Sequence, residues 1–173
     1  TRFRAEMDGL VVGESQATTG TEARNRYYQT LLGYTMVFPD GWTLNETPTT
    51  VSGSSAEGTA SLRVEVQRMQ ENKEPRLYIR DNLGIANLQK SEPLEQFRLQ
   101  GYTGTTEKDG RLQRIAVIYL GPRVFTFTGE ISDATQAEAL DAQLLTAIRS
   151  FRAIQTNERF AGNESRLRYV QVG

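Results

Sequence analysis

One apolar run limits the possible folds of this chain more than any other feature. Ile115–Leu120 (IAVIYL) is the most continuous apolar stretch, as expected of a central strand that is buried on both faces. Asp109-Gly110 precedes it and supplies the positive φ of a two-residue hairpin turn. Phe125–Ile131 follows it and alternates apolar with polar residues, as a neighbouring antiparallel strand does. The sequence therefore predicts an antiparallel sheet with a buried centre.

A second strand signal lies in Leu32–Trp42 (LGYTMVFPDGW), where large apolar side chains alternate with smaller ones up to Phe38. The next three residues predict a tight turn, because Pro39 fixes φ and Gly41 accepts a positive φ. Trp42, the only tryptophan, follows immediately. We expect Pro39, Gly41 and Trp42 to have structural roles, with Trp42 as a buried anchor of the core.

Two other stretches have strand character. Ser61–Met69 alternates apolar residues with charged or polar ones, which predicts a strand with one face in water. Leu94, Phe97 and Leu99 predict a strand that continues through Gly101–Thr106, where the β-propensity is high.

Two helices are expected among these strands. Asp133 can cap a helix whose apolar residues recur at steps of three and four, namely Ala137, Leu140, Leu144, Ile148 and Phe151. Pro75 suits the first turn of a shorter helix that Gly84 can terminate. The predicted fold class is therefore α+β, a sandwich around a central antiparallel sheet with one long C-terminal helix.

The first residues of the chain differ from the rest. Residues 1–13 place apolar side chains at helical spacing, and we expect them to form the trailing helix of an upstream domain. Residues 14–26 are polar, rich in threonine and aperiodic, which predicts a linker. We expect the compact domain to span residues 27–173.

The absence of histidine and cysteine excludes several kinds of chemistry within this chain. Histidine-based acid–base catalysis, Ser-His-Asp and Cys-His nucleophiles, and imidazole or thiolate zinc sites all require residues that it lacks. Twenty basic residues balance 21 acidic ones, and the net charge of −1 gives no general attraction to nucleic acid. No apolar run reaches the length of about 18 residues that a membrane span needs. We therefore expect no cofactor, no nucleic acid and no membrane span in this fragment.

Groups of acidic residues are candidates for carboxylate catalysis. Glu92 and Glu95 form one group, and Asp133, Glu138 and Asp141 form another. General acid–base catalysis needs two carboxylates in different environments, whereas these residues also suit helix capping and a solvated helix face. We expect the structural roles.

Four arginines are candidates for binding an anionic partner. Arg63, Arg68, Arg76 and Arg80 lie on a predicted strand and helix, with the aromatic Tyr78 nearby. The same residues are also what a water-facing strand and helix carry, so the sequence leaves the binding residues open.

Three segments, taken in order, resemble a known family. They are MDGLVVGES, LGYTMVFPDGW and AIRSFRAIQTNERFAGNESRLRYVQVG. In this order and spacing they resemble the region that follows the catalytic domain in bacterial Ste24-like zinc metallopeptidases. The middle segment also resembles the opening strand of PsbP-like domains, which implies an α/β/α sandwich that acts as a binding or assembly module.

The resemblance implies an accessory domain without catalytic or metal-binding residues of its own, since the zinc motif His-Glu-x-x-His has no counterpart here. Zinc is then expected only in an upstream peptidase domain of the parent protein. The implied partners are that domain in cis and other envelope proteins, and the implied location is the periplasm or another exported compartment. Two alternatives remain open: a free-standing PsbP-like module that binds a ligand or protein, and a carboxylate-based hydrolase.

Overall fold

The structure, a computed structural model, describes residues 26–158, and their elements divide between two compact units. The described residues of unit 1 form two stretches, one that ends at Trp42 and one that begins at Ser150. Unit 2 is Thr43–Arg149, between them in the sequence. Unit 1 contains β2 (Arg26–Gln29), β3 (Tyr34–Val37) and β11 (Arg152–Ala153). Unit 2 contains β4 (Thr43–Glu46), β5 (Thr50–Ser54), β6 (Ala60–Arg68), α2 (Pro75–Asp81), β7 (Gln89–Leu94), η1 (Gln96–Arg98), β8 (Gln100–Lys108), β9 (Arg111–Leu120), β10 (Arg123–Ile131), η2 (Ala134–Gln136) and α3 (Ala137–Arg149).

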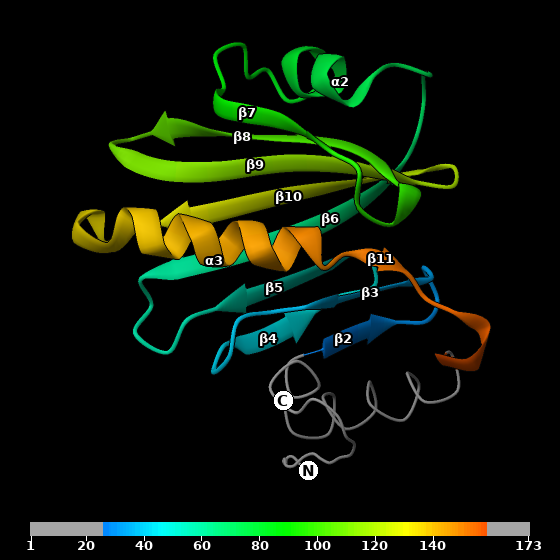
Figure 1. The fold of residues 1–173 in the computed structure, drawn as a ribbon, viewed down its shortest axis with the longest axis horizontal. Coiled ribbons are helices and arrows are strands. Elements are labelled where there is room, and N and C mark those ends of the chain that lie inside the picture. Colours follow the sequence, from blue (N-terminus) through cyan, green and yellow to red (C-terminus); the bar gives the residue numbers. More distant parts are fainter. Residues whose placement is uncertain (1–25, 159–173) are drawn as a thin grey trace. The chain divides into compact units, whose positions relative to one another are not determined.

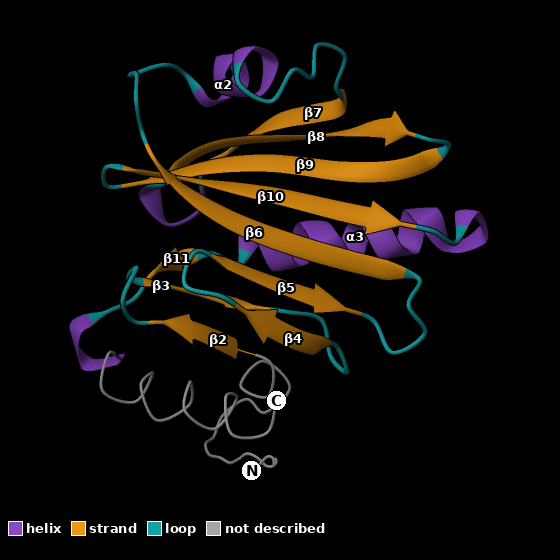
Figure 2. Cartoon of the chain, turned by 180° about the vertical axis from the view of Figure 1, so that it is seen from behind, coloured by secondary structure: helices purple, strands orange, loops and turns teal. Residues whose placement is uncertain are grey.

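Unit 2 is built on a seven-stranded sheet with the strand order β4-β5-β6-β10-β9-β8-β7 (Figures 1 and 2). Every neighbouring pair is antiparallel. The predicted central strand is β9, in which Ile115–Tyr119 are all buried. Asp109 and Gly110 join β8 to β9 with φ values of 55° and 77°, as the predicted hairpin turn requires.

α3 packs against β9 and β10 on one face of this sheet and crosses in front of it in Figure 1. The approach is close at Gly129, where an added Cβ would lie 2.7 Å from Cδ1 of Leu144. Glycine therefore leaves the space into which the helix packs.

α2 packs against β8 and β9 on the opposite face. Its residues Tyr78 and Ile79 join a buried cluster with side chains of β9 and β10, namely Ile115, Val117, Tyr119 and Val124. Because Val124 alternates with residues that face α3, the two helices cover opposite faces of the sheet. The strand predicted at Ser61–Met69 is β6, and its alternating burial confirms that one of its faces is in water.

The apolar stripe after Asp133 forms a shorter helix than the long C-terminal helix that the sequence predicted. α3 has 13 residues and ends at Arg149. Asp133 accepts a hydrogen bond from the Thr135 amide, but it caps the 3₁₀ turn η2 that comes before α3. Phe151 lies beyond the helix and stacks on Tyr34, with 4.9 Å between the ring centroids.

Unit 1 contains a three-stranded sheet with the order β11-β3-β2. The Pro39-Asp40-Gly41 turn follows β3: the Trp42 amide donates to the Pro39 carbonyl at 3.4 Å, and Gly41 has φ +81°. Trp42 is buried.

Two element boundaries differ from those that the sequence predicts. Phe97 does not continue a strand, because it lies in the turn between β7 and β8. Arg26, predicted as the last linker residue, begins β2. The predicted helix at residues 1–13, the rest of the linker and residues 159–173 lie outside the described residues.

Candidate functional site

The four arginines that the sequence singled out occupy separate places in unit 2. Arg63 donates to Glu65 at 2.8 Å, and Arg80 donates to Asp81 at 2.6 Å. Arg76 lies 4.0 Å from Glu74. Arg63 and Arg68 are an odd number of residues apart on β6 and therefore face opposite sides of the sheet. Their binding of an anionic partner stays a prediction.

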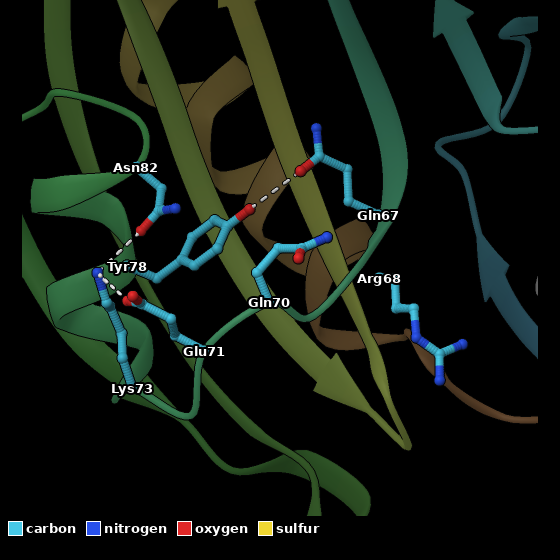
Figure 3. A pocket seen from close by; sticks show the side chains of 7 residues that line it. All are labelled: Gln67, Arg68, Gln70, Glu71, Lys73, Tyr78 and Asn82. Atoms are coloured by element: carbon cyan, nitrogen blue, oxygen red, sulfur yellow. Dashed lines mark hydrogen bonds and ion pairs between the residues drawn. The ribbon is translucent and has the colours of Figure 1, made fainter.

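Arg68 and Tyr78 line a small hollow of about 220 Å³ between β6 and α2 (Figure 3). Lys73 Nζ lies 3.3 Å from Glu71 Oε1 and 3.4 Å from Asp81 Oδ2, and it donates to Asn82 Oδ1 at 3.3 Å. The guanidinium of Arg68 points away from this cluster. Two carboxylates therefore surround the ammonium, and the hollow offers little attraction to an anion.

Two tyrosines hold the wall of this hollow in place. Tyr119 donates to the Lys73 carbonyl at 2.6 Å, and Tyr78 donates to Gln67 Oε1 at 3.5 Å. Burial raises the pKa of Tyr119 to about 12, and the neighbouring Tyr78 adds to the effect. Burial also raises the pKa of Tyr78, against the opposing effect of Lys73. Both phenols keep their protons at neutral pH, so they serve as hydrogen-bond donors and not as bases.

A larger hollow of about 630 Å³ lies on the face of the sheet that carries α2, over β4, β5, β6 and β10. Within unit 2, α2 covers the β8–β9 half of this face and leaves the other half open. We call this half the open face, and it is defined by Asn45, Ser52, Ser54, Ser61, Arg63, Glu65, Thr128 and Glu130.

Strand register arranges the open face in two rows that cross four strands. Asn45, Ser52, Arg63 and Thr128 pair successively from β4 to β10. Ser54, Ser61, Glu130 and Gln113 form the next row, from β5 to β9, and Gln113 Nε2 donates to Glu130 Oε2 at 3.1 Å. Hydroxyl, amide and charged groups thus lie side by side on a rigid scaffold.

The ion pair at the centre of the open face can exchange partners. The side chains of Arg63 and Glu65 are 57% and 44% exposed. Exposed pairs of this kind contribute about 0–1 kcal/mol. A ligand that offers a carboxylate to Arg63 or a donor to Glu65 therefore replaces the pair at small cost.

The candidate acidic residues lie in different surroundings. Glu92 accepts from Arg149 at 2.6 Å, Asp133 caps η2, and Glu95 and Glu138 are exposed. Within residues 26–158, Asp141 is the one buried carboxylate, and no group of three or more His, Cys, Asp or Glu residues is placed to hold a metal ion. None of the helices in this part of the chain is long and apolar enough to cross a membrane.

Asp141 corrects the expectation of a solvated helix face. It forms a bidentate ion pair with Arg114 of β9, with Nε–Oδ1 and Nη2–Oδ2 distances of 2.8 and 2.6 Å. The two side chains are 3% and 10% exposed. A signal for this pair was present in the sequence: Asp141 lies four residues after Ala137 and three before Leu144, inside the apolar stripe.

Comparisons with known proteins identify the fold. No protein-family model matches the sequence, and no curated protein matches it. The solution structure of CyanoP, the cyanobacterial PsbP of Synechocystis sp. PCC 6803, is similar with a TM-score of 0.56 and 16% identity. The match covers 80% of this chain and 98% of that one.

A second similar structure comes from Bacteroides thetaiotaomicron VPI-5482 and has a TM-score of 0.54 with 10% identity. That match covers 78% of this chain and 50% of the other. These likenesses concern the fold alone, and nothing in them links the chain to Ste24-like metallopeptidases. The chain has the PsbP-like fold that its middle segment predicted.

Proposed function

We propose that this chain is a non-catalytic module that recognises a protein partner through the open face of its seven-stranded sheet. The observation that supports this proposal is the hollow of about 630 Å³ on that face. Its lining combines hydroxyls with an exposed ion pair, and these groups can form hydrogen bonds to a polar partner. α3 packs against β10 and β9 on the opposite face, and together with the neighbouring strands it holds the hollow in shape.

The lining also favours binding over catalysis. Arg63 and Glu65 bond to each other, and Glu130 accepts from Gln113. Each serine and threonine on the open face would need an adjacent base to act as a nucleophile, and among them only Ser61 has a carboxylate, Glu130, as a cross-strand neighbour. That carboxylate is already held by Gln113. We therefore assign these groups to recognition.

A finer proposal rests on the sequence resemblance alone. The chain would be an accessory domain of an exported zinc metallopeptidase, used for packing against the peptidase domain in cis, for substrate presentation or for recognition of other envelope proteins. The full-length reading frame tests this proposal. An upstream His-Glu-x-x-His supports it, whereas its absence favours a free-standing binding module. Zinc binding by this chain in calorimetry would contradict the assignment of zinc to the upstream domain.

Site-specific photo-crosslinking tests the role of the open face. A photoreactive side chain is placed at Ser52, on the open face, or at Gln143, an exposed position of α3. In cells that natively produce the protein, we expect the Ser52 variant to crosslink to a discrete protein and the Gln143 variant to give none. Equal crosslinking at both positions, or none at Ser52, would contradict the proposal.

A further inference from the structure

The turn between β7 and β8 has a backbone that its residues do not favour. Leu94 pairs with Gly101, and the Leu99 amide donates to the Gln96 carbonyl at 2.9 Å. Phe97 and Arg98 between them have φ values of 53° and 65°. This is the geometry of a type I′ hairpin turn, in which both central residues are left-handed.

The next hairpin has the residue types that favour this turn geometry. Asp109-Gly110 makes the corresponding turn between β8 and β9, with φ values of 55° and 77°. Asp-Gly suits this turn, whereas a bulky aromatic residue at positive φ is strained. The strained Phe97 is 59% exposed, so no core packing accounts for its position. Gln96 anchors the turn by donating from Nε2 to the Ile148 carbonyl at 3.1 Å.

Two further arginines lie at the same end of the sheet. Arg123 is directly opposite Arg68 on the neighbouring strand and also opposite Leu120 of β9. Figures 1 and 2 both place the β7–β8 and β9–β10 turns at this end. Leu120 and Arg123 are half-buried, and Arg68 and Arg98 are exposed. We call Phe97, Arg98, Leu120, Arg123 and Arg68 the sheet-end patch.

The arginines of the sheet-end patch differ from most other arginines of unit 2. Arg63, Arg80, Arg114 and Arg149 each pair with a carboxylate. Among residues 26–158, none of Arg68, Arg98 and Arg123 has such a partner. Like charges directly opposite each other on adjacent strands destabilise a sheet, so the Arg68–Arg123 pair has a cost that an anion would remove.

We propose that the sheet-end patch binds an acidic segment of a partner protein, with its carboxylates on the arginines and an apolar side chain against Phe97 and Leu120. This inference goes beyond the proposed function, because it concerns a second surface of unit 2 and names the chemistry of the partner segment. Neighbouring strands lie about 4.8 Å apart, so the three arginines spread over roughly the length of a few extended residues. Arginine pairs with carboxylates in a bidentate geometry, which gives such a surface its selectivity.

The size of the patch favours a protein segment over an extended polyanion. The chain carries 21 acidic residues, and Glu95 lies two residues from Phe97. A nucleic acid or an anionic bilayer would extend beyond three arginines and meet carboxylates around them. A short acidic segment can bind within the patch without extending to the surrounding carboxylates.

An NMR titration of the whole chain tests the inference. The probe is a synthetic peptide of Glu and Asp residues around one leucine, and its control has Gln and Asn in their place. We expect the acidic peptide to shift the amide resonances of residues 96–99 and 120–123, and we expect the binding to weaken as salt is raised.

Two double variants remove the patch without unfolding the protein. Phe97→Asn/Arg98→Gly installs the favoured turn and should raise Tm by about 2–4 °C, while it weakens peptide binding at least tenfold. Arg68→Gln/Arg123→Gln should also weaken binding at least tenfold. The control Arg111→Gln removes an exposed arginine at the opposite end of β9 and should leave binding unchanged.

The inference is overturned if the acidic peptide produces no shifts, if the double variants bind it as well as the wild type, or if vesicles containing phosphatidylglycerol or single-stranded DNA bind the patch more tightly. Crosslinking at Ser52 without peptide binding would overturn this inference and leave the proposed function intact. Peptide binding at the patch without crosslinking at Ser52 would instead contradict the proposal that the open face binds a partner protein.

Discussion

At the scale of single residues, Trp42 is the clearest case of a position that the sequence marks and the structure explains. The turn that begins at Pro39 returns the Trp42 amide to the Pro39 carbonyl, and Gly41 takes the left-handed conformation that this turn requires. The indole that follows is only 8% exposed. The turn therefore directs a large side chain into the interior.

We predict that Trp42→Ala lowers the free energy of unfolding by about 3–5 kcal/mol, because it truncates a buried aromatic side chain. Leu31→Ala is the matched control, since Leu31 is an apolar residue of the same unit that is 80% exposed. The control should change the stability by less than about 0.5 kcal/mol. Denaturant titration measures both variants, and a loss below about 1 kcal/mol for Trp42→Ala would contradict the structural role.

Tyr119 gives a prediction about pH. Its pKa in the folded protein is about 12, above the ordinary tyrosine value of 10.0, so the folded state keeps the phenolic proton when the unfolded state has lost it. The stabilisation is complete below pH 10 and is lost as the pH rises toward 12.

We expect the phenolate absorbance of Tyr119, isolated as the difference between the wild type and Tyr119→Phe, to appear near pH 12. The stability of the wild type should fall more steeply than that of Tyr119→Phe between pH 10 and 12. Ionisation of Tyr119 near pH 10 in the folded protein would show that the phenol is open to water.

At the scale of elements, the Arg114–Asp141 pair fastens α3 to β9. Both guanidinium–carboxylate hydrogen bonds are short, and Arg114 Nη1 also donates to Thr103 Oγ1 at 3.4 Å. A buried charge without its partner is costly, whereas an apolar pair of similar volume can replace a buried ion pair with little loss. The pair therefore fixes where the helix lies without being the main source of its stability.

Removing one partner of the ion pair should destabilise the protein far more than replacing both partners with apolar residues. Asp141→Ala should destabilise the protein by about 3–5 kcal/mol, because it leaves Arg114 buried and unpaired. The double variant Arg114→Met/Asp141→Leu should recover most of that loss. Glu138→Ala, an exposed carboxylate of the same helix, is the control. If the effects of Arg114→Met and Asp141→Leu in thermal unfolding add up to that of the double variant, the pair does not interact as described.

The regular elements were predictable because their residues repeat with a period. The alternation along β6 and β10, the apolar run of β9 and the Asp109-Gly110 turn each indicate an antiparallel sheet. The end of α3 was not predictable from the stripe, because Phe151 continues the helical spacing but stacks on Tyr34 instead.

The features that depend on pairing between distant residues were harder to predict. Phe97 matches a strand pattern, and only the register of β7 against β8 places it in a turn. The open face depends on where α2 lies along the sheet, which no local pattern specifies. The cross-strand pairing of Arg68 with Arg123 likewise follows from the register of β6 against β10.

At the scale of the whole molecule, a PsbP-like fold supplies a rigid sheet whose open face and sheet-end patch carry exposed polar and charged groups. The chain contains none of the histidine ligands that the zinc motif of the resembled peptidases needs. The open face is the central claim.

The most direct test of that claim is the affinity of this chain for the partner protein that crosslinks to Ser52. Ser52→Tyr and Thr128→Tyr fill the hollow with side chains that suit a strand, and Gln143→Tyr adds the same bulk to the exposed side of α3. Calorimetry should show that each open-face substitution raises Kd at least tenfold, about 1.4 kcal/mol, with unchanged thermal stability. The Gln143→Tyr control should keep the wild-type affinity. Wild-type affinity in both open-face variants would contradict the account.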